Sequence, residues 1–132
     1  MEITTYTDKV PESILNPYRI SDDADFTIAF VLKQLGLSGH IQGYHLLKRS
    51  IRMMADNPEE AQLITKVIYP AIAKEFKINV PAVEKSIRDC VKRIKCSDEI
   101  KLAYIGWISS SYSNKQVIAS IAELVNMNMH RT

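Results

Sequence analysis

Apolar residues recur along most of this chain at the three- to four-residue spacing that is typical of amphipathic helices. The segment from residue 41 to residue 54 is a clear example, because its apolar positions share one helical face: Ile41, Tyr44, Leu47, Ile51 and Met54. No segment alternates apolar and polar residues over the length of a strand. The pattern therefore predicts an all-α fold of six or seven helices in one domain.

Residues that favour helix ends set the limits of the first predicted helix. Ser21-Asp22-Asp23 offers an N-cap together with carboxylates, which the amides of a first turn favour. Gly36 is suited to the position just after a helix, so this helix should end near Leu35. Its apolar stripe is expected to contain Phe26, Ala29, Phe30, Val31 and Leu32.

Three further helix starts are marked in the same way. Asn57-Pro58 places a capping residue before a proline, which predicts a helix that continues through Val67. Ser97 precedes two acidic residues and predicts another helix. Ser113 and Gln116 have the spacing of a capping box at the start of the last helix.

The segment over residues 68–95 has the form of a helix-turn-helix: a short helix to Phe76, a turn-sized gap over 77–80 and a longer helix over 81–95. Ala73 has the small side chain that a close helix crossing requires. Lys77 stands where many such motifs have Gly. The expected core contacts of the motif are Ile72, Phe76, Ile78 and Val83.

The longer helix of this motif has two distinct faces at about 100° per residue. One face is apolar and collects Val83, Ile87, Cys90, Val91 and Ile94. The opposite face is polar and collects Lys85, Arg88, Asp89 and Lys92. A recognition helix needs this division, because one side must pack on its domain while the other offers long donors to a DNA groove.

Composition fits one folded domain, with 132 residues of which 46% are hydrophobic and 24% charged. We expect an irregular arm over residues 1–20, a helical domain over 21–127 and a loose tail over 128–132. The net charge is only +2, but it is unevenly distributed. Residues 74–95 hold seven basic and three acidic side chains, whereas residues 1–25 hold two basic and six acidic ones. A basic helical segment of this kind is typical of phosphate binding.

Other function classes find little support. No apolar run is long enough to span a bilayer and no secretory signal is present, so a cytoplasmic protein is expected. Cys90 and Cys96 cannot form a disulfide framework, and Cys90 is expected in the core. His40 and His45 fall on different helical faces, which disfavours a metal site. Trp107 is expected to be a core residue. We expect no enzyme activity and no cofactor.

Three strings resemble a known family: residues 39–44 (GHIQGY), 64–74 (ITKVIYPAIAK) and 83–88 (VEKSIR). They are similar to the C-terminal effector domain of the stage-zero sporulation response regulator of endospore-forming bacteria. The similarity covers roughly residues 25–125 and includes Ser113-Asn114 at the start of the last helix. It implies a six-helix response-regulator effector domain, winged-helix-like in class, that binds double-stranded DNA at short promoter boxes as tandem dimers. It also implies contact with the RNA polymerase sigma factor.

The resemblance also implies roles for individual residues. By position, Glu84, Lys85 and Arg88 match base-reading residues, and Lys85 stands where the family usually has Arg. Ala82 falls where the family has a further base-contacting Arg, and Pro81 where it has Ser, so we expect either a different target box or a lower affinity for DNA. Candidates for contact with DNA phosphates are His40, Lys66, Lys74, Lys77 and Lys92.

Full-length members of that family carry a phosphorylated receiver domain before this module, whereas only about 20 irregular residues precede it here. We therefore expect that phosphorylation control of that kind is absent from this chain. Two functions remain open. The first is a sequence-specific DNA-binding transcription regulator, and the second is a protein-interaction module that keeps the fold and modulates a full-length regulator without reading DNA.

Overall fold

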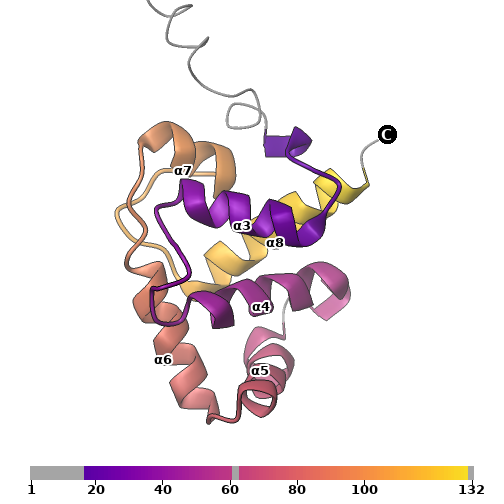
Figure 1. Cartoon of the computed structure of the whole chain (residues 1–132), viewed down its shortest axis with the longest axis vertical. Coiled ribbons are helices and arrows are strands. Elements are labelled where there is room, and N and C mark those ends of the chain that lie inside the picture. Colours follow the sequence, from indigo (N-terminus) through magenta and orange to yellow (C-terminus); the bar gives the residue numbers. More distant parts are fainter. Residues whose placement is uncertain (1–16, 61–62, 131–132) are drawn as a thin grey trace, which may run out of the picture.

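The computed structural model describes residues 17–60 and 63–130 of the chain. Within these ranges it contains six α-helices and no strand, which confirms the all-α prediction (Figure 1). The helices are α3 (Ala24–Gln34), α4 (Tyr44–Asp56), α5 (Tyr69–Phe76), α6 (Val80–Val91), α7 (Asp98–Tyr104) and α8 (Asn114–Met129). Short helical turns lie at η1 (Pro17–Arg19), η2 (Pro58–Glu60) and η3 (Ile64–Ile68). Residues 1–16 of the expected arm and residues 131–132 of the expected tail lie outside the described residues.

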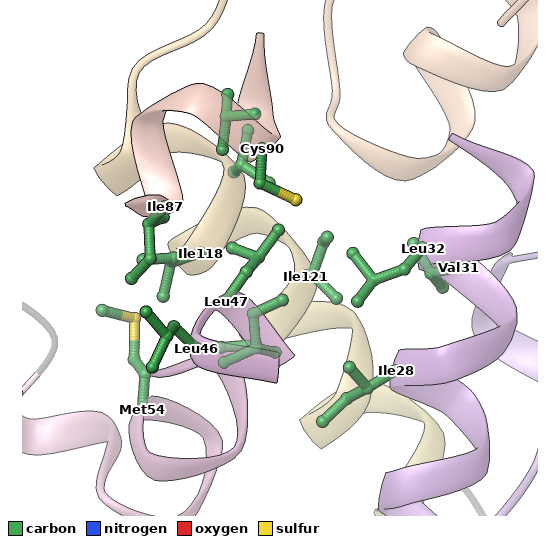
Figure 2. Close-up of a cluster of buried hydrophobic side chains, with 14 of the residues drawn as sticks. Ile28, Val31, Leu32, Leu46, Leu47, Met54, Ile87, Cys90, Ile118 and Ile121 are labelled. Carbon is green, nitrogen blue, oxygen red and sulfur yellow. The ribbon is translucent and has the colours of Figure 1, made fainter. Parts of the chain in front are cut away.

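Helix α8 lies at the centre of the fold and packs against α3, α4 and α6. Its buried positions include Ile118 and Ile121, which meet side chains from all three of these helices (Figure 2). From α3 come Ile28, Val31 and Leu32; from α4, Leu47; and from α6, Ile87 and Cys90. This single core fixes α6 to the rest of the domain along its whole inner face.

Local capping bonds define most helix starts as predicted. The Asp23 side chain accepts a hydrogen bond from the Phe26 amide at 3.0 Å, and the Ser97 side chain caps α7 in the same way. At α8, the Gln116 amide donates to Ser113 Oγ at 3.1 Å while the Ser113 amide donates to Gln116 Oε1 at 2.9 Å. The predicted capping box is therefore confirmed.

The apolar stripe predicted for α3 is wrong in part. Phe26 is 55% exposed and stacks on Phe30 instead of entering the core. The fully buried positions are Thr27, Ile28, Val31 and Leu32. Thr27 can lie inside because its hydroxyl donates to the Ser21 carbonyl at 3.4 Å, so its polar atom is not left without a partner.

The helix predicted from Asn57-Pro58 through Val67 is also wrong. Asn57 ends α4, because its backbone amide donates to the carbonyls of Met53 and Met54 and its side chain also donates to Met53. Only the single turn η2 follows. Residues 61–62 lie outside the described ranges, and η3 then leads directly into α5. Pro70 lies in the first turn of α5, a position at which proline is tolerated.

Helix α6 begins and ends earlier than the predicted range of 81–95. It starts at Val80 after the Asn79 cap, which reduces the turn of the motif to the three residues 77–79. After Lys92 the backbone hydrogen bonds join residues three positions apart, as in a turn. The Lys95 amide then donates to the Leu35 carbonyl at 3.0 Å. This bond draws the chain across the end of α3, so the helix cannot continue to residue 95.

Within the helix-turn-helix, Ile72 and Val83 are fully buried and Ala73 is buried at the helix crossing, as predicted. Phe76 and Ile78 are each 38% exposed, so their assignment to the core is wrong. They flank Lys77, whose left-handed backbone (φ 59°) turns the chain at the outer edge of the motif.

The Lys77 conformation yields a stability prediction. Lys77→Gly is expected to raise the free energy of unfolding by about 0.5–1 kcal/mol, because glycine adopts positive φ without the clash between Cβ and carbonyl. Urea denaturation followed by circular dichroism measures the change. The matched control is Lys74→Gly within α5, which should lower stability by about 1 kcal/mol. Destabilisation by both variants would contradict the prediction.

Two other assignments change at the ends of the described chain. Helix α8 includes residues 128 and 129, which were expected to belong to a loose tail. Asn128 is fully buried, where its side chain accepts from the Ile20 amide at 2.6 Å and donates to the Pro17 carbonyl at 2.7 Å. Residues 17–20 of the expected arm, together with Ser21, are thereby fixed to the end of α8.

Trp107 was expected in the core but is 39% exposed. It lies in the loop after α7, where its ring contacts Tyr112 edge-on with centroids 5.6 Å apart. The Tyr112 hydroxyl donates to the Trp107 carbonyl at 2.6 Å, so the aromatic pair orders this loop. The core beneath it is completed by Tyr104 and Ile105 instead.

Candidate nucleic-acid interface

Helix α6 has the two faces that its sequence predicts. Val83, Ile87, Cys90 and Val91 are buried, whereas the outward positions are exposed: Glu84, Lys85, Arg88, Asp89 and Lys92. Burial raises the pKa of the Cys90 thiol to about 11, so this cysteine is a neutral core group at ordinary pH. The long basic side chains of α6 are therefore all directed away from the core.

The backbone of α6 is held closely by α4. Gly43 precedes α4 with φ of 89°, and its α-carbon faces the backbone of Ser86 in the middle of α6. A Cβ built on Gly43 would clash with the Ser86 carbonyl oxygen and lie 2.7 Å from its carbon. Backbone therefore packs against backbone at this point, which fixes the position of α6 relative to the start of α4.

The charged side chains on the outward face of α6 differ in whether they form a salt bridge. Lys85 Nζ donates to Asp89 at 2.8 Å, and this hydrogen bond lowers the pKa of the Asp89 carboxyl. Over residues 17–60 and 63–130, Arg88 and Lys92 take part in no salt bridge. Arg88 and Lys92 are thus the cations of this face that are open to an external anion.

A cleft of about 640 Å³ opens beside this face, between η3, α6 and the start of α8. Asn114 ties its walls together, because its side-chain amide donates to the Tyr69 hydroxyl and to the Glu84 carbonyl, both at 3.2 Å. Burial raises the pKa of the Tyr69 hydroxyl, which therefore stays neutral. The charged residues of the lining are Lys66, Glu84, Arg88, Lys92 and Lys115.

The structure brings together four of the eight site residues predicted from sequence. Lys66, Glu84, Arg88 and Lys92 line the cleft, and Lys85 is on the adjoining outward face of α6. The other three are exposed elsewhere: Lys74 on α5, Lys77 in the turn and His40 in the loop before α4. His40 Nδ1 lies 3.0 Å from Ser38 Oγ, so a local hydroxyl already engages it.

Sequence reasoning missed Asn114 and Lys115 as parts of this region. They are some 30 residues from α6 along the chain, so no helical periodicity links them to it. The signal that was present is the Ser113-Asn114 string, which by itself indicates only the start of the last helix.

Two arginines of α4 form a separate set of ion pairs, one with the first helix of the motif and the other with α3 and the end of α4. Arg49 of α4 donates through Nε to both carboxylate oxygens of Glu75 on α5, at 3.1 and 3.0 Å. Arg52 bridges Asp25 of α3 and Asp56 of α4, and the hydrogen bond to Asp25 is the main reason that its pKa is raised. These pairs are solvent-exposed, so they set helix orientation more than they add stability.

Neither metal chemistry nor a membrane span is indicated in the described part of the chain. Within it, no three His, Cys, Asp or Glu side chains are grouped closely enough to hold a metal ion. Likewise, none of the helices in residues 17–60 and 63–130 combines the length and apolar character needed to cross a membrane.

A short helix, a three-residue turn and a second helix with a basic outer face together form a helix-turn-helix of the kind found in helical DNA-binding domains. A family model described as the C-terminal domain of the sporulation initiation factor Spo0A matches residues 28–125, which is most of the chain. The chain therefore belongs to this family of DNA-binding effector domains, and the resemblance seen in the sequence is confirmed. The family is a regulatory class and not a class of enzymes.

Proposed function

We propose that this protein is a sequence-specific transcription regulator whose helix α6 enters the major groove of double-stranded DNA. The observation that carries the proposal is the geometry of α6. Its inner face is fixed against α4 at Gly43, while Arg88 extends from the outer face without a salt bridge in the described residues. A rigid helix with an available guanidinium is what direct reading of base edges requires.

Different residues of α6 are suited to contact different base edges. Arg88 can donate two parallel hydrogen bonds to O6 and N7 of guanine, and Glu84 can accept from N4 of cytosine. Lys85 contacts DNA when its solvent-exposed hydrogen bond to Asp89 is replaced by one to a base or a phosphate oxygen. Pro81 and Ala82 form the first turn and present apolar groups, which suit the methyl group of thymine.

Sequence-independent affinity comes from basic residues around this helix. Lys66 and Lys92 lie at the cleft, Lys74 and Lys77 lie on the first helix and the turn, and His40 lies in the loop before α4. Contacts of this kind hold DNA without identifying it and make binding depend on salt. We further propose action in the cytoplasm on short promoter boxes, as a homodimer on tandem sites that contacts the RNA polymerase sigma factor.

Selection of duplexes from a random library, followed by fluorescence-anisotropy titration, tests the proposal. The full chain should bind the selected duplex at least tenfold more tightly than a scrambled duplex of equal composition, at both 50 and 200 mM KCl. Affinity for both duplexes should fall as salt rises. Equal binding to the two duplexes would exclude sequence reading, and absence of binding at 50 mM would exclude DNA as the ligand.

A second candidate is a protein-interaction module that modulates a full-length regulator. It is favoured by three exposed apolar side chains in α7 and in the loop that follows it: Leu102, Trp107 and Ile108. Such a grouping is typical of protein contacts. Absence of DNA binding at low salt in the titration above would leave this candidate as the better explanation.

A further inference from the structure

We infer that the cleft between η3, α6 and the start of α8 seats the sugar-phosphate backbone of the DNA, and that Lys115 is a phosphate contact on the wall opposite α6. The inference rests on the proposed function, since it assumes that α6 lies in the major groove. It extends the interface to a third element, α8, to which neither the sequence nor the helix-turn-helix motif assigns a role in DNA binding.

The charge of the cleft is the first reason. Four cations surround it: Lys66 from η3, Arg88 from α6, Lys92 directly after α6, and Lys115 from α8. Glu84 is the one acidic residue in the lining, and none of the four cations forms a salt bridge within the described residues. A cleft with four cations and one acidic side chain has a net positive charge and is complementary to a polyanion.

The position of the cleft is the second reason. Glu84 and Arg88 line the cleft and also belong to the outward face of α6, so the cleft adjoins the surface that would meet base edges. The major groove is about 12 Å wide, and a helix with its side chains is about 10–12 Å across. The phosphates of the two strands therefore run close along both sides of an inserted helix, and one strand passes over this cleft.

Asn114 makes the arrangement rigid. Its two hydrogen bonds join the start of α8 to the Glu84 carbonyl in α6 and to the Tyr69 hydroxyl at the start of α5. The distance from Lys115 to the base-reading residues is thereby fixed before DNA arrives. Asn114 is a positioning residue in this scheme, and Lys115 supplies the charge.

The experiment compares Lys115→Ala with Lys33→Ala, a second exposed lysine, which is on α3 and does not line the cleft. The full chain is titrated with the selected and the scrambled duplex between 50 and 300 mM KCl. Lys115→Ala should weaken binding to both duplexes by about fivefold at 100 mM, and should reduce the slope of log affinity against log salt by about one. Lys33→Ala should change neither quantity, and Lys115→Arg should restore both.

Each outcome separates this inference from the proposed function. An unchanged slope for Lys115→Ala, with preference for the selected duplex retained, would overturn the phosphate contact alone. Equal binding of the wild-type chain to both duplexes, with the slope still reduced by Lys115→Ala, would overturn sequence reading alone. Unaltered thermal unfolding of Lys115→Ala establishes that the variant is folded.

Discussion

Gly43→Ala is expected to lower the free energy of unfolding by about 3 kcal/mol. Two effects add. The backbone at Gly43 has φ of 89°, a conformation that an L-residue adopts only under strain. The new methyl group would also clash with the Ser86 carbonyl oxygen and lie 3.3 Å from Cys90 Cβ, so α6 would have to move away from α4. Urea unfolding followed by circular dichroism measures the loss.

Gly39→Ala is the matched control for this substitution. A Cβ on Gly39 would meet only the ring of His45, at 3.7 and 3.8 Å, which is ordinary van der Waals contact. Its stability should stay within about 0.5 kcal/mol of the wild type, as for most surface changes. Because α6 is the proposed reading helix, Gly43→Ala should also weaken DNA binding under conditions where it remains folded. Equal stability of the two variants would mean that the close approach of α4 and α6 does not constrain the fold.

The parts of the fold that the sequence predicted depend on contacts between near neighbours. The caps at Asp23, Ser97 and Ser113 join residues three positions apart, so they can be identified in any folded context. The two faces of α6 follow from helical geometry for the same reason. Asn57 shows the limit of this reasoning, because the same side chain can end the preceding helix or begin the next one.

The parts that the sequence did not predict depend on contacts between distant segments. Gly43 entered the sequence analysis only as part of the string over residues 39–44, and its contact with Ser86 comes from the packing of α4 on α6. Asn128 gave no signal that it would bind the backbone of residues 17–21. Asn114 and Lys115 reach the candidate interface only because α8 starts beside Glu84. In each case tertiary packing, and not local preference, decides the role.

The second large effect concerns which side chains at α6 contact bases and which contact phosphates. Arg88→Ala is expected to weaken binding to the selected duplex by about 1–3 kcal/mol, or roughly 5- to 150-fold, because a bidentate contact with guanine is lost. Binding to the scrambled duplex should weaken only by the few-fold that one cation contributes. Lys92→Ala should weaken both duplexes by the same small factor and reduce the salt slope by about one. Both side chains are exposed, so neither truncation should disturb the core.

Arg88→Lys separates the geometry of the guanidinium from its charge. It keeps the cation of the cleft but cannot form the two parallel bonds to O6 and N7, so it should bind the scrambled duplex like the wild type and still lose affinity for the selected one. Anisotropy titrations of the three variants against both duplexes, between 50 and 300 mM KCl, provide the comparison and the salt slopes. Equal loss of binding to both duplexes in Arg88→Ala and Lys92→Ala would mean that Arg88 is a phosphate contact. Sequence reading would then have to come from Glu84, Lys85 and the apolar first turn of α6.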